Sequence, residues 1–80
     1  MINVKHLKPY EIYVLNIDTF LFSDHDFRDP YGSRLIKFDH FMFLKLIEGK
    51  NHCHLKVLTK HGIGYLFIPT YEPNPLISEI

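Results

Sequence analysis

LKVLTKHGIGYLFIP, residues 55–69, is the part of this 80-residue chain that most strongly indicates its architecture. Two short apolar runs, rich in β-branched and aromatic residues, flank the dipeptide His61-Gly62. Glycine adopts a positive φ without steric cost, as a tight hairpin turn requires, and histidine tolerates the left-handed region better than most residues. The stretch therefore predicts a β-hairpin, which is a signature of fold rather than of chemistry.

The rest of the chain also favours strands, because it lacks alanine and contains many β-branched and aromatic residues. Five strand-like segments are expected, at residues 11–17, 19–22, 35–48, 52–59 and 63–69. The third is predicted to bend near Phe38-Asp39-His40. Residues 71–80 contain Pro73 and Pro75 and are expected to form an extended tail or a single short turn. We predict one all-β domain over residues 1–80, a small, partly open barrel of five strands.

Composition limits the classes of function. Nine basic and nine acidic residues give zero formal charge, which removes the electrostatic footprint of a typical nucleic-acid-binding protein. No apolar run reaches the ~18 residues of a membrane span, and no leader peptide is expected. The single Cys53 cannot form an internal disulfide, so a cytoplasmic location is expected. The bias toward Ile, Leu, Lys and Phe is common in AT-rich genomes, including those of many phages, for which the location would be the host cytoplasm.

Alternation predicts which side chains face the core. One parity of residues 52–59 is apolar and is predicted to point inward: Cys53, Leu55, Val57 and Thr59. The other parity is predicted to point outward: His52, His54 and Lys56. In residues 41–48 one face has Met42, Leu44 and Leu46 and the other has Phe41, Phe43, Lys45 and Ile47, so both faces are apolar through Phe43. A small antiparallel barrel normally leaves one face wet, so the second face is covered by the tail or contacts a partner.

The C-terminal half resembles a Src-homology-three-like barrel of the bacterial kind, over about residues 19–71. The resemblance is carried by a strand, a tight glycine turn, a Gly-Tyr-hydrophobic motif and a Pro- or Tyr-bearing turn: Lys56-Val57-Leu58-Thr59, Lys60-His61-Gly62, Gly64-Tyr65-Leu66, and Pro69 with Tyr71. It implies a long loop at residues 23–33 and a diverging turn at Phe38-Asp39-His40-Phe41. The chain has no tryptophan to pack a polyproline helix, so proline-rich peptides are not the expected ligands.

Histidines provide the sharpest local chemical signal. His52 and His54 lie two residues apart on one strand, so they project to one face and could ligate one metal ion, whereas Cys53 points the opposite way. Further ligands would have to come from Asp39, His40 or His61. The more common structural role of such a pair is a polar outer face, and we predict no bound cofactor.

Catalytic and calcium-binding patterns are incomplete. Asp24 and Asp26 alternate in an acidic loop, but the glycine and distal glutamate of a calcium-binding EF-hand are missing. Cys53 and its histidine neighbours point to opposite faces, and Ser23, Ser33 and Ser78 have no supporting motif. We therefore predict that the protein is not an enzyme.

The predicted function is protein–protein interaction, as a small accessory or adaptor protein or an assembly component. Aromatic anchors carry most interface energy, with polar residues at the rim. The predicted anchors are Phe41, Phe43, Tyr65, Phe67 and Tyr71. The predicted rim residues are Asp24, Asp26, Lys45 and Lys56. The partner would be another protein or a second copy of the chain, joined through the aromatic face or an edge strand.

Two other classes of function remain open at this point. The first is a barrel that binds single-stranded nucleic acid, in which Phe41, Phe43 and Tyr65 would stack on bases beside Lys45 and Lys56. The second is the histidine-based metal site. For residues 63–69, either Leu66 and Ile68 or Tyr65 and Phe67 must be core, and the other pair is the place to look for a partner.

Overall fold

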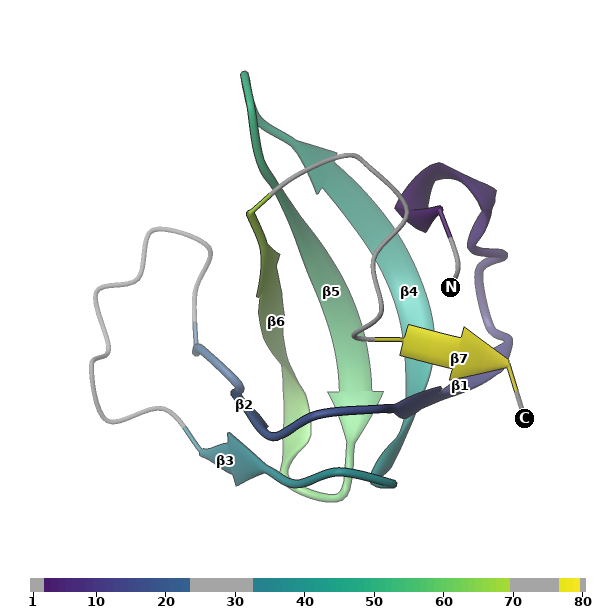
Figure 1. The fold of residues 1–80 in the computed structure, drawn as a ribbon, viewed down its shortest axis with the longest axis vertical. Helices are drawn as coiled ribbons and strands as arrows, with labels where there is room; N and C mark the ends of the chain where they lie inside the picture. Colours follow the sequence, from purple (N-terminus) through teal and green to yellow (C-terminus); the bar gives the residue numbers. More distant parts are fainter. Residues whose placement is uncertain (1–2, 24–32, 70–76, 80) are drawn as a thin grey trace.

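A computed structural model describes residues 3–23, 33–69 and 77–79 of the chain. Seven strands and one short 3-10 helix occur in this part: η1 (Val4–His6), β1 (Ile12–Leu15), β2 (Thr19–Phe20), β3 (Arg34–Leu35), β4 (His40–Glu48), β5 (Cys53–Thr59), β6 (Gly62–Ile68) and β7 (Ile77–Glu79). Five of them form an antiparallel sheet in the order β6-β5-β4-β1-β7, and β2 and β3 form a separate two-stranded sheet (Figure 1). The prediction of an all-β domain is confirmed.

The β5–β6 hairpin forms as its sequence predicts. Thr59 and Gly62 are register partners, with Lys60 and His61 between them. Gly62 has a φ of 97°, so the glycine adopts the positive φ, as expected, and His61 does not. The Thr59 hydroxyl accepts a hydrogen bond from the His61 N–H and donates one to the Gly62 carbonyl, each at 3.0 Å. The Thr59 side chain therefore supplies hydrogen-bond partners to the backbone of the turn from within its four residues.

A bulge in β4 overturns the predicted alternation of this strand. Phe43 pairs with Val57 and Lys45 pairs with Lys56, so Leu44 is an extra residue without a register partner. The added residue reverses which side chains point inward beyond this position. Lys45 and Ile47 therefore lie on the face opposite to Phe43, and the prediction that they share its face is wrong.

The core lies on the inner face of the sheet. The buried apolar side chains are Val4, Leu7, Tyr13, Leu15, Leu21, Leu35, Phe41, Phe43, Cys53, Leu55, Val57, Leu66, Ile68 and Ile77. The inward orientation of Cys53 is confirmed, and Leu66 and Ile68 are the core pair of β6. Tyr65 and Phe67 consequently belong to the outer face.

The segment after β2 returns to the far edge of the large sheet. Phe22 and Tyr65 exchange two backbone hydrogen bonds, of 2.9 and 2.8 Å, and Figure 1 shows β2 beside β6. Gly64 makes this approach possible, because a Cβ at its position would lie 2.5 Å from Leu21 Cγ. Leu21 therefore packs directly against the backbone of β6.

Three elements differ from the expectation. β7 joins the sheet beside β1, whereas the tail was expected to be extended or a short turn. Pairing with β1 supplies backbone partners that no local pattern in the tail reveals. The segment at 35–48 is divided into β3 and β4, and η1 forms with Asn3 Oδ1 accepting the Lys5 N–H at 3.0 Å. The tail at 70–76 and the loop at 24–32 lie outside the described residues.

Candidate functional site

The outer face of the five-stranded sheet carries a row of apolar side chains that water reaches. Ile12 pairs with Met42, Met42 with Leu58 and Leu58 with Ile63, so the row crosses β1, β4, β5 and β6. Ile12, Leu58 and Ile63 are 40%, 42% and 59% exposed, and Met42 is half-buried. We call these four residues the apolar row. Contiguous exposed apolar surface on a small domain is typical of an interaction site.

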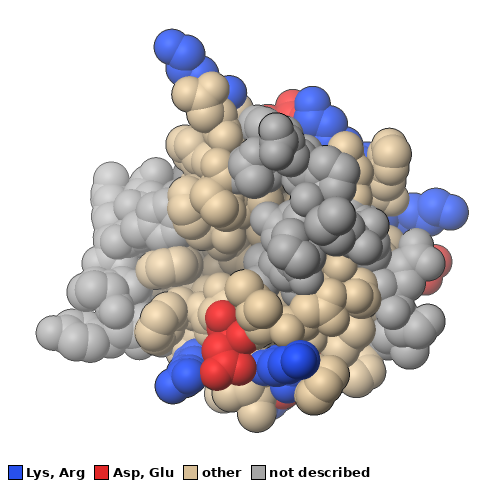
Figure 2. Space-filling view, in the orientation of Figure 1, with Lys and Arg blue, Asp and Glu red and all other residues tan. Residues whose placement is uncertain are grey.

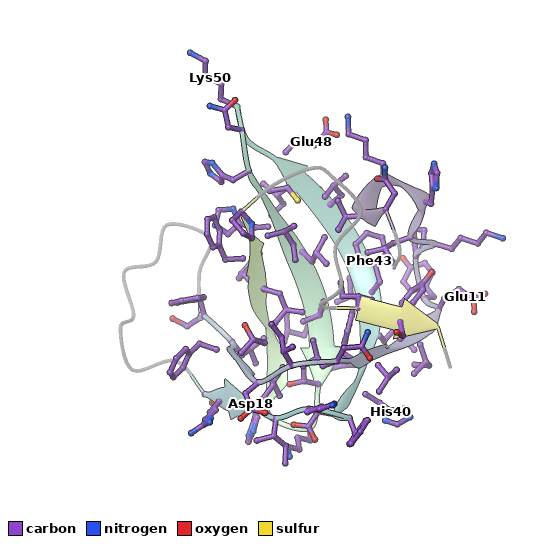
Figure 3. All side chains as sticks on the ribbon, viewed as in Figure 1. Glu11, Asp18, His40, Phe43, Glu48 and Lys50 are labelled. Carbon is purple, nitrogen blue, oxygen red and sulfur yellow. The ribbon has the colours of Figure 1, made fainter. Side chains whose placement is uncertain are left out.

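An open hollow adjoins the apolar row. Its volume is about 180 Å³, and its lining consists of Ile12, His40, Phe41, Met42, Leu58 and Thr59. His40, labelled in Figure 3, stands at this end of β4, whereas Glu48 and Lys50 mark the opposite end. The hollow can therefore receive an apolar side chain of a partner, with the imidazole of His40 at its edge.

A second row of the outer face is basic. Lys45 is the register partner of Lys56, and Lys56 is the partner of Tyr65. Lys45 is exposed, and Lys56 and Tyr65 are half-buried. Within the described residues, neither lysine side chain forms an ion pair. Like charges directly opposite on neighbouring strands repel one another, so this arrangement is unfavourable in isolation.

A third row contains aromatic and imidazole rings. His54 pairs with Ile47 on one side and with Phe67 on the other. The rings of His52, His54 and Phe67 form a triangle with all three centroid separations at 5.5 Å. His54 has the outward parity predicted for it, but it is buried, with only 5% of its surface exposed. This row is consequently a packed ring cluster rather than an open surface.

The aromatic anchors predicted from sequence lie on different sides of the sheet. Phe41 and Phe43 are 2% and 3% exposed and belong to the core, so their assignment to an exposed aromatic face is corrected. Phe41 pairs with Tyr13 and Phe43 with Val57, and both partners are buried. Tyr65 and Phe67 lie on the outer face, together with Lys45 and Lys56. Tyr71, Asp24 and Asp26 lie outside the described residues.

The single thiol belongs to the core. Cys53 has no exposed surface, and its burial, together with the nearby charge of Glu48, raises the pKa of the thiol to about 11. The thiol is therefore protonated at neutral pH, and a protonated thiol is a poor nucleophile. Cys53 fills space between the strands.

The histidine pair does not extend into a larger set of metal ligands within the part of the chain that the structure describes. No group of three or more His, Cys, Asp or Glu side chains there could hold a metal ion. The candidate additional ligands are placed elsewhere: His40 contacts Phe38, and Asp39 contacts Lys60. His52 and His54 contact each other and Phe67 through their rings.

A second exposed feature is the turn of residues 36–39, which lies where the sequence predicts a bend, although Phe38 is not among the residues predicted to contact a partner. The Asp39 N–H donates to the Ile36 carbonyl at 3.0 Å, and Phe38 occupies the third position with a φ of 76°. Positive φ at this position is typical of a type II turn, which normally has glycine or asparagine there. The Phe38 side chain is 68% exposed, and Lys37 Nζ lies 5.1 Å from the centre of its ring.

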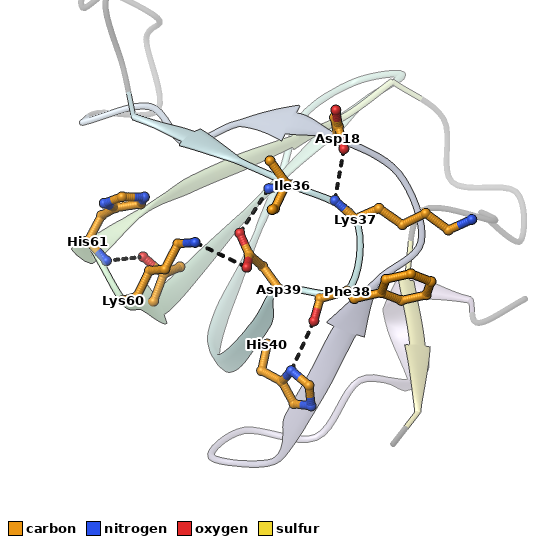
Figure 4. Close-up of polar contacts among 9 residues, drawn as sticks. Asp18, Ile36, Lys37, Phe38, Asp39, His40, Lys60 and His61 are labelled. Carbon is orange, nitrogen blue, oxygen red and sulfur yellow. Dashed lines mark hydrogen bonds and ion pairs between the residues drawn. The ribbon is translucent and has the colours of Figure 1, made fainter.

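Two carboxylates hold this turn in place (Figure 4). Asp18 accepts the Lys37 N–H and an Arg34 N–H, both at 2.8 Å, and Asp39 accepts the Ile36 N–H at 2.8 Å and contacts Lys60 at 3.2 Å. In each case the backbone hydrogen bond is the main reason that the pKa of the carboxyl lies below its ordinary value of 3.8. Figure 2 shows acidic atoms between basic side chains at the lower end, where Figure 3 labels Asp18.

Comparison with protein-family models, with curated proteins and with solved structures finds no match for this chain. Among the described residues, no helix has the length and apolar character needed to cross a membrane.

Proposed function

We propose that this protein is a non-enzymatic protein-binding module, an accessory or adaptor protein or an assembly component. Its contact surface is the outer face of the sheet, centred on the apolar row. The observation that supports this proposal is the register that aligns Ile12, Met42, Leu58 and Ile63 across four strands. Three of these side chains expose at least 40% of their surface to water, and burying them against a partner is favourable at about 25 cal/mol per Å².

The proposed surface differs from the aromatic face expected from sequence. Aliphatic side chains form its centre, Tyr65 and Phe67 flank it on β6, and Lys45 and Lys56 form its polar border. An apolar centre with a polar border is the usual anatomy of a protein interface. The buried Cys53 is compatible with a reducing compartment, so we place the proposed activity in the cytoplasm.

We further propose that the fold is a small, partly open barrel of the Src-homology-three-like type. The bridge between Phe22 and Tyr65 supports this, because it brings the chain that leaves β1 and β2 back to β6. In solution, slow amide exchange at Phe22 and Tyr65 together with that of β5 would support the barrel. Fast exchange at both amides while β5 stays protected would favour an open sheet.

Site-specific photocrosslinking tests the proposed function. A photoreactive phenylalanine analogue replaces Ile63 in the apolar row, or Ile36 as the control, since Ile36 is 50% exposed but lies in the turn before β4. In the native source, we expect a covalent partner from position 63 and not from position 36. Leu58→Ser in the same chain should weaken capture at position 63. Equal capture at both positions, or none at position 63, would contradict the proposal.

A further inference from the structure

Lys45 and Lys56 of the outer face have no ion pair among the described residues, and this indicates the charge expected of a partner. We propose that this face binds an acidic, amphipathic protein segment, whose carboxylates lie over Lys45 and Lys56 and whose apolar side chains cover the apolar row. This inference rests on the proposed function and adds the chemical nature of the partner. It is carried by the charge and register of the described residues on β1, β4, β5 and β6.

Lys45 and Lys56 form a site that attracts an anion. As register partners on one face, their Cβ atoms lie about 4.5–5.5 Å apart. Three other cations of the described residues stand beside carboxylates: Arg34 beside Asp18, Lys60 beside Asp39 and Lys5 beside Glu48. A carboxylate of a partner placed between Lys45 and Lys56 would replace their mutual repulsion by two attractive contacts.

The outward positions of the four strands include no acidic residue among those described. They are occupied by Ile12, Val14, His40, Met42, Lys45, Ile47, His54, Lys56, Leu58, Ile63, Tyr65 and Phe67. Glu48 ends β4 in register with the buried Cys53, and it therefore belongs to the opposite parity. A second copy docking through the same face would offer Lys45 and Lys56 no carboxylate from the described outward positions. Charge complementarity consequently favours a different, acidic partner over self-association through this face.

The apolar row favours a protein segment over a nucleic acid. Nucleic acids bind to such barrels by stacking bases on aromatic rings beside basic residues. Leu58 and Ile63 have no ring to stack on, and Tyr65 is half-buried beside Lys56. Aliphatic side chains instead contact the apolar side chains of a polypeptide.

Spacing along β5 predicts the pattern that the partner must present. Lys56 and Leu58 are two residues apart on the same face, which corresponds to about 6.6 Å along the strand. An acidic and an apolar group about 6.6 Å apart occur at alternate residues of an extended segment or about one turn apart on a helix. The expected partner therefore combines Glu or Asp with Leu, Ile or Val at such spacings.

Binding of defined probes to the intact chain tests the inference. The probes are fluorescent 14-residue peptides in which every second residue is Ser and the residues between them are alternately Glu and Leu, Lys and Leu, or Glu and Ser, so that both groups of a pair lie on one face of an extended chain. A 14-nucleotide oligothymidylate is the fourth probe. We expect the Glu/Leu peptide to bind most tightly, measured by fluorescence anisotropy. Lys56→Glu should weaken its binding about tenfold, and the weakening should shrink as salt is raised. The matched control Lys50→Glu makes the same charge change at the end of the β4–β5 hairpin (Figure 3) and should leave the affinity unchanged.

Charge exchange provides the decisive comparison. The double variant Lys45→Glu/Lys56→Glu should prefer the Lys/Leu peptide, whereas the wild-type chain prefers the Glu/Leu peptide. Binding that depends on Leu58 and Ile63 but ignores the charges at positions 45 and 56 would overturn the acidic partner and leave the proposed function standing. Tighter binding of the oligothymidylate would overturn the inference in favour of nucleic acid. Absence of binding by every probe would also overturn it, while photocrosslinking at position 63 would still decide the proposed function.

Discussion

Two neighbouring turns at one end of the molecule solve the same backbone problem with different residues (Figure 4). The β5–β6 turn has its positive φ at Gly62, with a value of 97°, and the turn of residues 36–39 has it at Phe38, with a value of 76°. Glycine has no Cβ to collide with the backbone, whereas any other L-residue is destabilised in this region by roughly 1–2 kcal/mol. The first turn therefore follows from local preference, and the second persists only because its surroundings hold it.

The contacts around Phe38 explain how the less favourable turn is maintained. Its N–H donates to the Leu15 carbonyl at 2.8 Å, and His40 Nδ1 lies 3.1 Å from its carbonyl, a hydrogen bond in the Nδ1-protonated tautomer. Asp18 and Asp39 fix the two preceding backbone amides. Lys60 of the β5–β6 turn contacts Asp39, so the self-sufficient turn helps to stabilise the strained one.

The largest effect is expected from a substitution that forces a non-glycine residue to adopt the positive φ of the β5–β6 turn, as Phe38 does in the turn of residues 36–39. Gly62→Ala should lower the free energy of unfolding by about 1 kcal/mol, because the strain exceeds the gain from a stiffer unfolded chain. An added Cβ meets nothing within 4 Å, so the loss would report backbone conformation alone. Urea denaturation measures it. A chemically synthesised chain with D-alanine at position 62 is the control and should be at least as stable as the wild type, because D-alanine favours positive φ and also stiffens the unfolded chain. An equal loss in both variants would show a cause other than φ.

The sequence predicts the parts of the fold that have a local signal and misses those that depend on distant segments. Glycine and alternation mark the β5–β6 hairpin, and the inward orientation of Cys53 follows from its apolar neighbours. The bulge at Leu44 has no local signal, because the residues around it are apolar on both faces. β7 depends on pairing with β1, which is distant in the chain. Interactions between distant segments therefore decide what local patterns leave open.

The opposite substitution at the 36–39 turn should have a smaller, stabilising effect. Phe38→Gly removes the steric strain at φ 76° but gives the unfolded chain more freedom and loses the contact with Lys37. We expect a net gain of about 0.5 kcal/mol in the free energy of unfolding. Phe38→Leu is the control, since it removes the ring and keeps the Cβ, and it should give no gain. Destabilisation by both Phe38→Gly and Phe38→Leu would mean that the ring stabilises the turn more than its conformation strains it.

The candidate surface was predictable in part. Lys45 and Lys56 were expected at a polar border, and Tyr65 and Phe67 were identified as an alternative outward pair. Phe41 and Phe43 were misplaced because both faces of their strand are apolar, so alternation alone could not identify the inner one. The apolar row arises from the register of β1, β4, β5 and β6, which no single segment encodes. The Phe38 turn had only the aspartates as a signal, and their roles depend on tertiary contacts.

The smallest effect concerns the carboxylates that hold the 36–39 turn. The pKa values of Asp18 and Asp39 are lowered from 3.8, chiefly by the N–H groups of Lys37 and Ile36. A carboxyl with a lowered pKa in the folded state contributes its full stabilisation above 3.8, where both states are ionised. As the pH falls, the unfolded state binds the proton first, so the contribution decreases and is lost once the pH has passed below the folded-state pKa, where both states are protonated. Asp18 is exposed and Asp39 is partly exposed, so solvent screens the effect.

Acid denaturation of the Asp18→Asn/Asp39→Asn variant isolates this contribution. Asparagine keeps an oxygen that accepts the backbone N–H bonds but cannot titrate, so the difference in stability between the wild type and the variant should shrink between about pH 5 and pH 2. Glu11→Gln is the control, because it removes an exposed carboxylate that has no ion pair among the described residues and does not belong to the turn. Urea titrations at several pH values measure these differences. If both variants followed the same pH dependence, the charges of Asp18 and Asp39 would not be what stabilises the turn of residues 36–39.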